Sequence, residues 1–101
     1  MQIHITGTPP TITRQVQAYA EYKVFSHLAS LASRVATVQV IVAEPEHRDG
    51  DTVCTITADL GGAGCVRTRA RGAHLTRAID VAAGNVARSA ARRLAARRGG
   101  R

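Results

Sequence analysis

Apolar and polar residues alternate along four segments of the chain, which is the pattern of strands that bury one face. The four segments are residues 1–7, 37–43, 52–60 and 65–71. A polar stretch at residues 44–51 separates the second and third segments and predicts a hairpin turn. The glycine-rich run Gly61-Gly62-Ala63-Gly64 separates the third and fourth, where glycine permits positive φ angles.

Two further segments repeat apolar residues every three or four positions, as amphipathic helices do. The first begins near the candidate N-caps Thr11 and Thr13 and extends to about Ala32. Its apolar stripe is Val16, Tyr19, Ala20, Val24, Leu28, Leu31 and Val35. The second covers residues 73–98, with the stripe Leu75, Ile79, Ala82, Val86, Ala90 and Leu94. Gly84 interrupts this helix at a cost of roughly 1 kcal/mol, so we expect a close helix–helix contact there.

The order of these elements is β-α-β-β-β-α, which predicts an α+β domain. Because each helix has one apolar stripe, both helices are expected on one face of a four-stranded sheet, with the other face in solvent. This arrangement is related to that of the double-stranded-RNA-binding domain, although element order does not identify function. Strand parity directs Cys54 inward and Cys65 outward, so no disulfide is expected.

Composition limits the class of protein. The 101 residues are enough for one domain, and 45% are hydrophobic but only 3% aromatic, so the core is expected to be aliphatic. No apolar run approaches the ~20 residues that span a bilayer, and the N-terminus lacks the pattern of a secretory signal. We therefore expect a cytoplasmic protein. Catalytic motifs, a phosphate-binding loop and metal-ligand spacings are missing from the sequence, so we expect neither an enzyme nor a cofactor.

Charge is distributed unevenly along the chain. Residues 1–59 hold four basic and six acidic residues, whereas residues 60–101 hold ten arginines and one acid, Asp80. The two parts carry −2 and +9, and the whole chain carries +7. A basic surface confined to one part of a protein is typical of a nucleic-acid partner. The alternative is a GC-rich genome, which favours arginine codons.

Two arginine clusters account for this charge. Arg67, Arg69 and Arg71 alternate along one strand and share its solvent face, where they suit a phosphate backbone or serve only to discourage sheet aggregation. In the second helix, Arg77, Arg88 and Arg92 lie opposite the apolar stripe, and Arg93, Arg97 and Arg98 add charge near its end. Matching of the helix dipole is the alternative there. In the first helix, Tyr22 and Phe25 lie off the stripe, where they would stack on a base, meet a protein partner or pack on a loop.

Several short motifs occur in the order typical of one family. They are Met1-Gln2-Ile3-His4-Ile5-Thr6-Gly7, Ile12-Thr13, Lys23, Ser33-Arg34-Val35, Arg71-Gly72, Ala78-Ile79-Asp80 and the basic residues from Arg88 onward. In these motifs the chain resembles the ribosome hibernation factors, the family of hibernation-promoting factor, ribosome-associated inhibitor A and sigma-54 modulation protein. It departs from the family pattern at Arg71 and His74, where the family has acidic residues, and in a first helix that is poor in Lys and Arg.

The resemblance implies a β-α-β-β-β-α domain that binds the small ribosomal subunit in the channel of messenger and transfer RNA. Such a domain contacts ribosomal RNA through basic helices and silences idle ribosomes during stress, without catalysis or a cofactor. Residues 1–98 would be the single ribosome-binding domain, and residues 99–101 a tail or the start of a linker. The RNA-binding residues expected on these grounds are Lys23, Arg67, Arg69, Arg71, Arg77, Arg88, Arg92, Arg93, Arg97 and Arg98. The alternatives are an Arg-rich protein-interaction module and a general double-stranded nucleic-acid binder.

Overall fold

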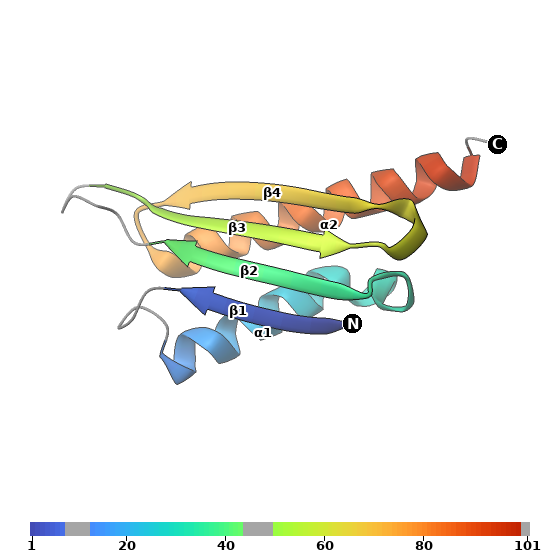
Figure 1. Cartoon of the computed structure of the whole chain (residues 1–101). Coiled ribbons are helices and arrows are strands. Elements are labelled where there is room, and N and C mark those ends of the chain that lie inside the picture. The colour runs from blue at the N-terminus through green and yellow to red at the C-terminus, as the bar shows by residue number, and fades with distance from the viewer. Residues whose placement is uncertain (8–12, 44–49, 100–101) are drawn as a thin grey trace.

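The computed structural model describes residues 1–7, 13–43 and 50–99, and it has the predicted order of elements (Figure 1). Four strands and two long helices are joined by two short 3-10 helices, η1 and η2. The bounds are β1 Gln2–Gly7, α1 Arg14–Leu28, η1 Ala29–Arg34, β2 Thr37–Ala43, β3 Thr52–Asp59, η2 Gly61–Ala63, β4 Cys65–Gly72 and α2 Leu75–Gly99. The predicted hairpin turn at residues 44–51 lies mostly outside the described residues.

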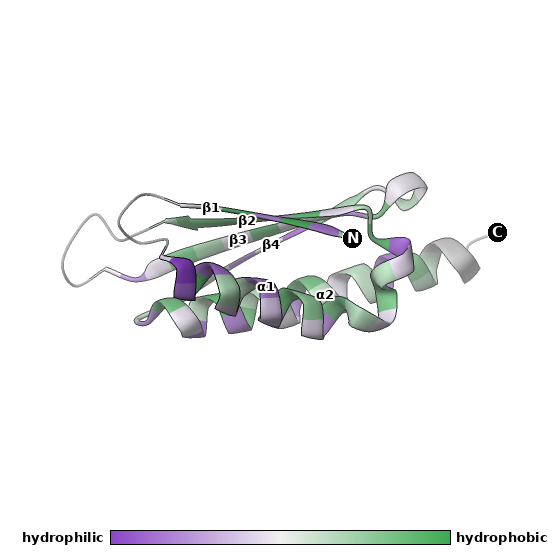
Figure 2. Cartoon of the chain, turned by 90° about the horizontal axis from the view of Figure 1, so that it is seen from below, coloured by the Kyte–Doolittle hydropathy of each residue, from purple (hydrophilic) through white to green (hydrophobic). Residues whose placement is uncertain are grey.

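The four strands form one sheet in the order β1-β2-β3-β4. β1 pairs with β2 in parallel through the α1 crossover, and the remaining two pairs are antiparallel. Both helices lie against one face of this sheet, and the other face is open (Figure 2). The predicted two-layer α+β architecture is therefore confirmed.

The core between the layers is aliphatic, as the low aromatic content predicts. Alternate residues of the two central strands point into it: Val38, Val40 and Val42 from β2, and Cys54, Ile56 and Ala58 from β3. From α2, the predicted stripe is buried from Ile79 to Leu94, together with Ala78 and Ala83. Small alanine side chains allow α2 to lie close to β4, and the hydroxyl of Thr68 donates to the Ala82 carbonyl at 3.2 Å. Burial against α2 therefore fixes which face of β4 points outward.

The first helix begins where the sequence predicts but ends earlier. The Thr13 hydroxyl accepts from the Val16 amide at 3.2 Å, which confirms Thr13 as the N-cap; Thr11 lies outside the described residues. The α-helix stops at Leu28 rather than near Ala32, and residues 29–34 continue as the tighter η1. Apolar residues spaced by three and four fit both helix types, so periodicity does not separate them. α2 likewise begins at Leu75, two residues after the predicted start.

The turn between β3 and β4 needs its glycines. Gly61 and Gly64 have φ angles of +62° and +92°, in the region that glycine adopts without strain. The Asp59 carboxylate accepts from the Gly61 amide at 2.9 Å, and the Leu60 amide donates to the Gly64 carbonyl at 2.7 Å. This closed turn confirms the predicted use of positive φ and sets the register of β4 against β3.

The two helices meet at Gly84, as predicted. This buried residue faces α1, and a Cβ built on it would lie 3.6 Å from Cε1 of His27. That distance is an ordinary van der Waals contact. Cys54 is buried, Cys65 is exposed and both are free thiols, which confirms the predicted strand register.

Within the described ranges, none of the helices is long and apolar enough to cross a membrane. The same residues contain no group of His, Cys, Asp or Glu side chains able to hold a metal ion.

Candidate nucleic-acid interface

The first arginine cluster lies on the open face of the sheet, along the β4 edge. Arg67, Arg69 and Arg71 are all exposed and stand opposite Thr57, Thr55 and Val53 of β3. The Arg67 Nε donates to the Thr57 hydroxyl at 3.3 Å, so this guanidinium extends across the sheet toward β3. The predicted grouping of the three side chains on one face is confirmed.

The second cluster lies on the opposite layer, on α2. Arg77, Arg88 and Arg92 are exposed, whereas Ile79 and Val86 of the same helix are fully buried against the sheet. A guanidinium nitrogen of Arg88 donates to the Asn85 side-chain oxygen. We call Arg77, Arg88 and Arg92 the α2 ridge. The ridge and the β4 arginines therefore point away from opposite layers of the molecule, and of the ridge only Arg92 lines the groove next to β4.

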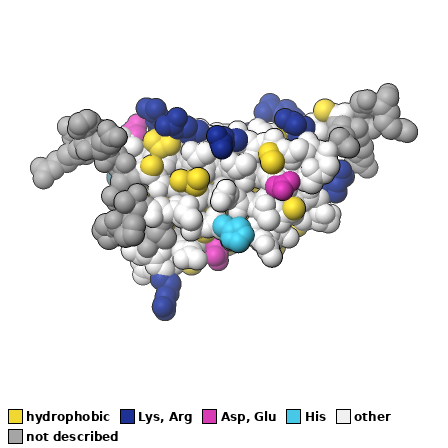
Figure 3. Space-filling view, in the orientation of Figure 1, with side chains coloured by type: hydrophobic (Ala, Val, Ile, Leu, Met, Phe, Trp, Pro, Cys, Tyr) yellow, Lys and Arg dark blue, Asp and Glu magenta, His cyan; other side chains and the backbone are white. Residues whose placement is uncertain are grey.

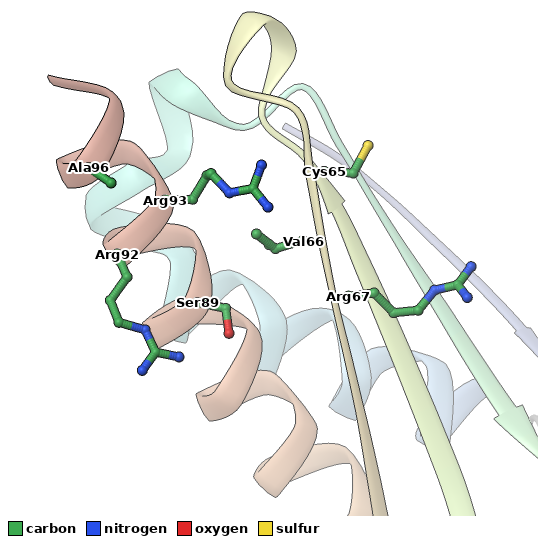
Figure 4. A pocket seen from close by; sticks show the side chains of 7 residues that line it. All are labelled: Cys65, Val66, Arg67, Ser89, Arg92, Arg93 and Ala96. Carbon is green, nitrogen blue, oxygen red and sulfur yellow. The ribbon is translucent and has the colours of Figure 1, made fainter. Parts of the chain in front are cut away.

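An open groove runs between α2 and β4 where the two layers meet at the β4 edge (Figure 4). Its volume is about 470 Å³, and it is lined by Cys65, Val66, Arg67, Ser89, Arg92, Arg93 and Ala96. The Arg93 side chain extends toward the turn before β4, where Nη1 donates to the Ala63 carbonyl at 3.3 Å. Arg92 instead points away from β4 into solvent. The groove thus continues the basic surface around the edge, from the ridge to the open face.

None of these arginines has a carboxylate partner among the residues that the structure describes. Their hydrogen bonds go to neutral groups: a hydroxyl for Arg67, an amide oxygen for Arg88 and a carbonyl for Arg93. In the space-filling view of the open face, Lys and Arg side chains gather mainly along the β4 edge (Figure 3). Guanidinium groups without a counter-charge are suited to bind carboxylate or phosphate oxygens in pairs.

Lys23 differs from the other predicted RNA-binding residues because it already has an acidic partner. Its Nζ lies 3.4 Å from Oδ1 of Asp80 on α2 and 5.8 Å from the centre of the Tyr19 ring. His27 Nε2 approaches the same carboxylate oxygen at 3.6 Å. Sequence reasoning missed this cluster, although Lys23 and Asp80 both occur in the motifs that carry the family resemblance. Arg97 and Arg98 belong to α2, but the structure does not describe their side chains.

The fold and its arginines define a class: a two-layer α+β domain with an arginine-rich surface on α2 and β4. No protein-family model and no curated protein matches the sequence. Among solved structures, the chain is similar to a ribosomal subunit interface protein from Coxiella burnetii, with a TM-score of 0.80 and 14% identity over 94% of this chain and 99% of that one. It is also similar to the N-terminal domain of Protein Y from Thermus thermophilus, with a TM-score of 0.69 and 27% identity over 88% of this chain and 94% of that one.

Both of these proteins are members of the hibernation factor family. At 14% identity, the first likeness establishes the fold alone. The second adds a higher identity across nearly the whole domain. The family resemblance in the sequence motifs is thus confirmed by the chain's structural neighbours.

Proposed function

We propose that this protein associates with the ribosome and inhibits translation. It binds the RNA of the small subunit and occupies the channel through which messenger and transfer RNA pass. The observation that carries the proposal is the α2 ridge, a set of exposed arginines without described carboxylate partners on a fold shared with a ribosomal subunit interface protein. The Protein Y domain, at 27% identity, supports the same function.

Binding rests on charge neutralisation of the RNA backbone. Arg88 and Arg92 are four residues apart, so their backbones rise about 6 Å along the helix and their side chains share one face. Each phosphate that they neutralise releases condensed counterions, which makes affinity steeply dependent on salt. Arg93, next to Arg92 of the ridge, continues the contact surface toward β4. Lys23, Arg97 and Arg98 complete the proposed set, with Lys23 contributing less because Asp80 balances its charge.

Inhibition by occlusion of the channel needs no chemical step. The described part of the chain measures 49 × 23 × 17 Å along its principal axes, and this folded body would exclude other ligands from the space it fills. Because the rigid core of β2, β3 and α2 holds the ridge in place, the ridge orients this body on the RNA. The β4 arginines lie on the other layer and are expected to matter less than Arg88 and Arg92.

Translation in a purified system tests this mechanism. Protein added at roughly one copy per ribosome should stop synthesis without nucleotide or metal, and excess transfer RNA should relieve the inhibition. Stable binding beside fully occupied transfer RNA sites would contradict occlusion. Failure to bind ribosomes, combined with tight binding to an acidic protein, would favour an Arg-rich protein-interaction module instead.

A further inference from the structure

We propose that the edge opposite the arginines, formed by β1 and α1, is a self-association surface on which a second copy of this chain docks. This inference concerns a different part of the molecule from the proposed RNA interface and does not depend on it. It rests on the composition of the β1 edge, on an apolar groove beside it and on the distribution of charge.

The strand β1 lacks two of the features that protect sheet edges, charged residues and proline. Among the described residues β1 pairs only with β2, so its other side offers free backbone groups. The strand Gln2–Gly7 contains no charged residue and no proline, the devices that natural edge strands use against pairing. The other edge strand, β4, is protected by Arg67, Arg69 and Arg71. The contrast marks β1 as the edge open to another strand.

An apolar groove lies between this edge and α1. It is lined by Met1, Ile3, Ala18, Glu21, Tyr22 and Phe25. Tyr22 is 65% exposed and Phe25 is 54% exposed, so more than half of each side chain faces solvent. The whole chain has only three aromatic residues, and two of them lie here. Aromatic side chains are enriched in the buried centres of protein interfaces, so this groove is suited to a protein surface.

The distribution of charge favours this edge for the docking of a second copy. Approach of two copies through their Arg-rich parts is opposed by like charge, because residues 60–101 carry +9. The groove carries one acid, Glu21, and the strand beside it is uncharged, so the β1 edges meet without this repulsion. A two-fold axis perpendicular to the sheet then sets β1 antiparallel to its copy, as in other isologous dimers. Tyr22 and Phe25 of each copy pack on the partner's groove, and the arginines lie at the two far ends.

Sedimentation of the purified, nucleic-acid-free chain tests the proposal. At low salt the arginine-rich parts repel, whereas at about 1 M salt the Debye length falls to roughly 3 Å and this repulsion is screened. The mass should rise with concentration from 10.7 kDa toward twice that value, and more readily at high salt. The amides of β1 should gain protection from hydrogen exchange in the dimer. A chain that remains monomeric at high concentration in about 1 M salt would overturn the proposal.

Two variants locate the surface. Tyr22→Glu with Phe25→Glu changes exposed positions only and should keep the chain monomeric, with circular dichroism confirming the fold. Gln2→Lys, which places a cation on the edge strand, should weaken association independently. Val81→Glu is the matched control, since Val81 is an exposed apolar residue (41%) on α2 and far from the groove in sequence. Loss of the dimer in the Val81 control alone would show that another face is used. A dimer that persists both in the Tyr22/Phe25 variant and in the Gln2 variant would show the same.

Discussion

Lys23 and Asp80 form an ion pair between the two helices, with the Lys23 Nζ 3.4 Å from the Asp80 Oδ1. Asp80 is the only acidic residue in the arginine-rich part of the chain, and it is directed toward α1 rather than toward the ridge. The pair therefore joins the helices, and among the described residues the exposed arginines of α2 form no ion pair. His27 adds a second contact to the same oxygen at 3.6 Å.

This pair is expected to contribute little to stability. About half of the Asp80 side chain is in solvent, so water and salt screen the attraction. A double-mutant cycle with Lys23→Met and Asp80→Asn should give a coupling free energy below about 1 kcal/mol, falling with added salt. Urea unfolding of the four proteins measures it. A coupling of several kcal/mol that salt does not reduce would show that the pair is effectively buried.

Gly84→Ala is expected to stabilise the protein by about 1 kcal/mol, because alanine favours the helical backbone over glycine by that amount. The added methyl group would lie 3.6 Å from His27 and from Arg88, so nothing must move to admit it. Gly64→Ala is the contrasting variant: φ is +92° and the methyl group would lie 3.1 Å from Arg93, so it should destabilise. Thermal unfolding of both variants gives the sign of each change in stability. A destabilising Gly84→Ala would mean that the two helices pack more tightly at Gly84 than the 3.6 Å distance to His27 indicates.

The two thiols should differ sharply in reactivity. Burial raises the pKa of Cys54 from 9.0 to about 11, whereas Cys65 is exposed. A thiol reagent should therefore label one cysteine in the folded protein and two after unfolding, and intact mass should not change on reduction. Rapid labelling of both thiols in the folded chain, or a 2 Da gain on reduction, would contradict the strand register.

The same shift in pKa predicts a loss of stability at alkaline pH. Between pH 9 and 11 the unfolded chain releases the Cys54 proton while the folded chain retains it. Unfolding is then favoured as pH rises, by about 1.4 kcal/mol per pH unit within this window. Cys54→Ala should remove this component of the pH dependence. Equal slopes in the parent and the variant would show that the thiol does not cause it.

The sequence predicted the elements and their faces well because alternation is unambiguous in a sheet with one wet side. Cys54, Cys65 and the β4 arginines all point as strand parity requires. The predicted end of α1 was wrong, because the spacing of Leu28 and Leu31 fits an α-helix and a 3-10 helix equally. Local pattern does not contain the information that the chain must tighten there before it enters β2.

The candidate site was less accessible to sequence reasoning. Both arginine clusters were found, but periodicity within one element does not show how the α2 ridge lies relative to the β4 arginines. The contact between Arg93 and the Ala63 carbonyl joins residues 30 positions apart and depends on how α2 lies against the turn. The pairing of Lys23 with Asp80 likewise arises from packing between helices that are distant in sequence.

Co-sedimentation of the chain with small ribosomal subunits tests the central claim most directly. Arg88→Glu with Arg92→Glu should abolish binding at moderate salt, because both residues are exposed and the fold does not depend on them. Arg14→Glu with Arg34→Glu is the matched control: it changes the net charge equally at two exposed positions outside the ridge. The control should pellet with the subunits like the parent, with a slope of log affinity against log salt of roughly −0.7 to −0.9 per phosphate neutralised. If the ridge variant pellets like the parent, or if the control loses binding to the same extent, α2 does not hold this protein on the ribosome.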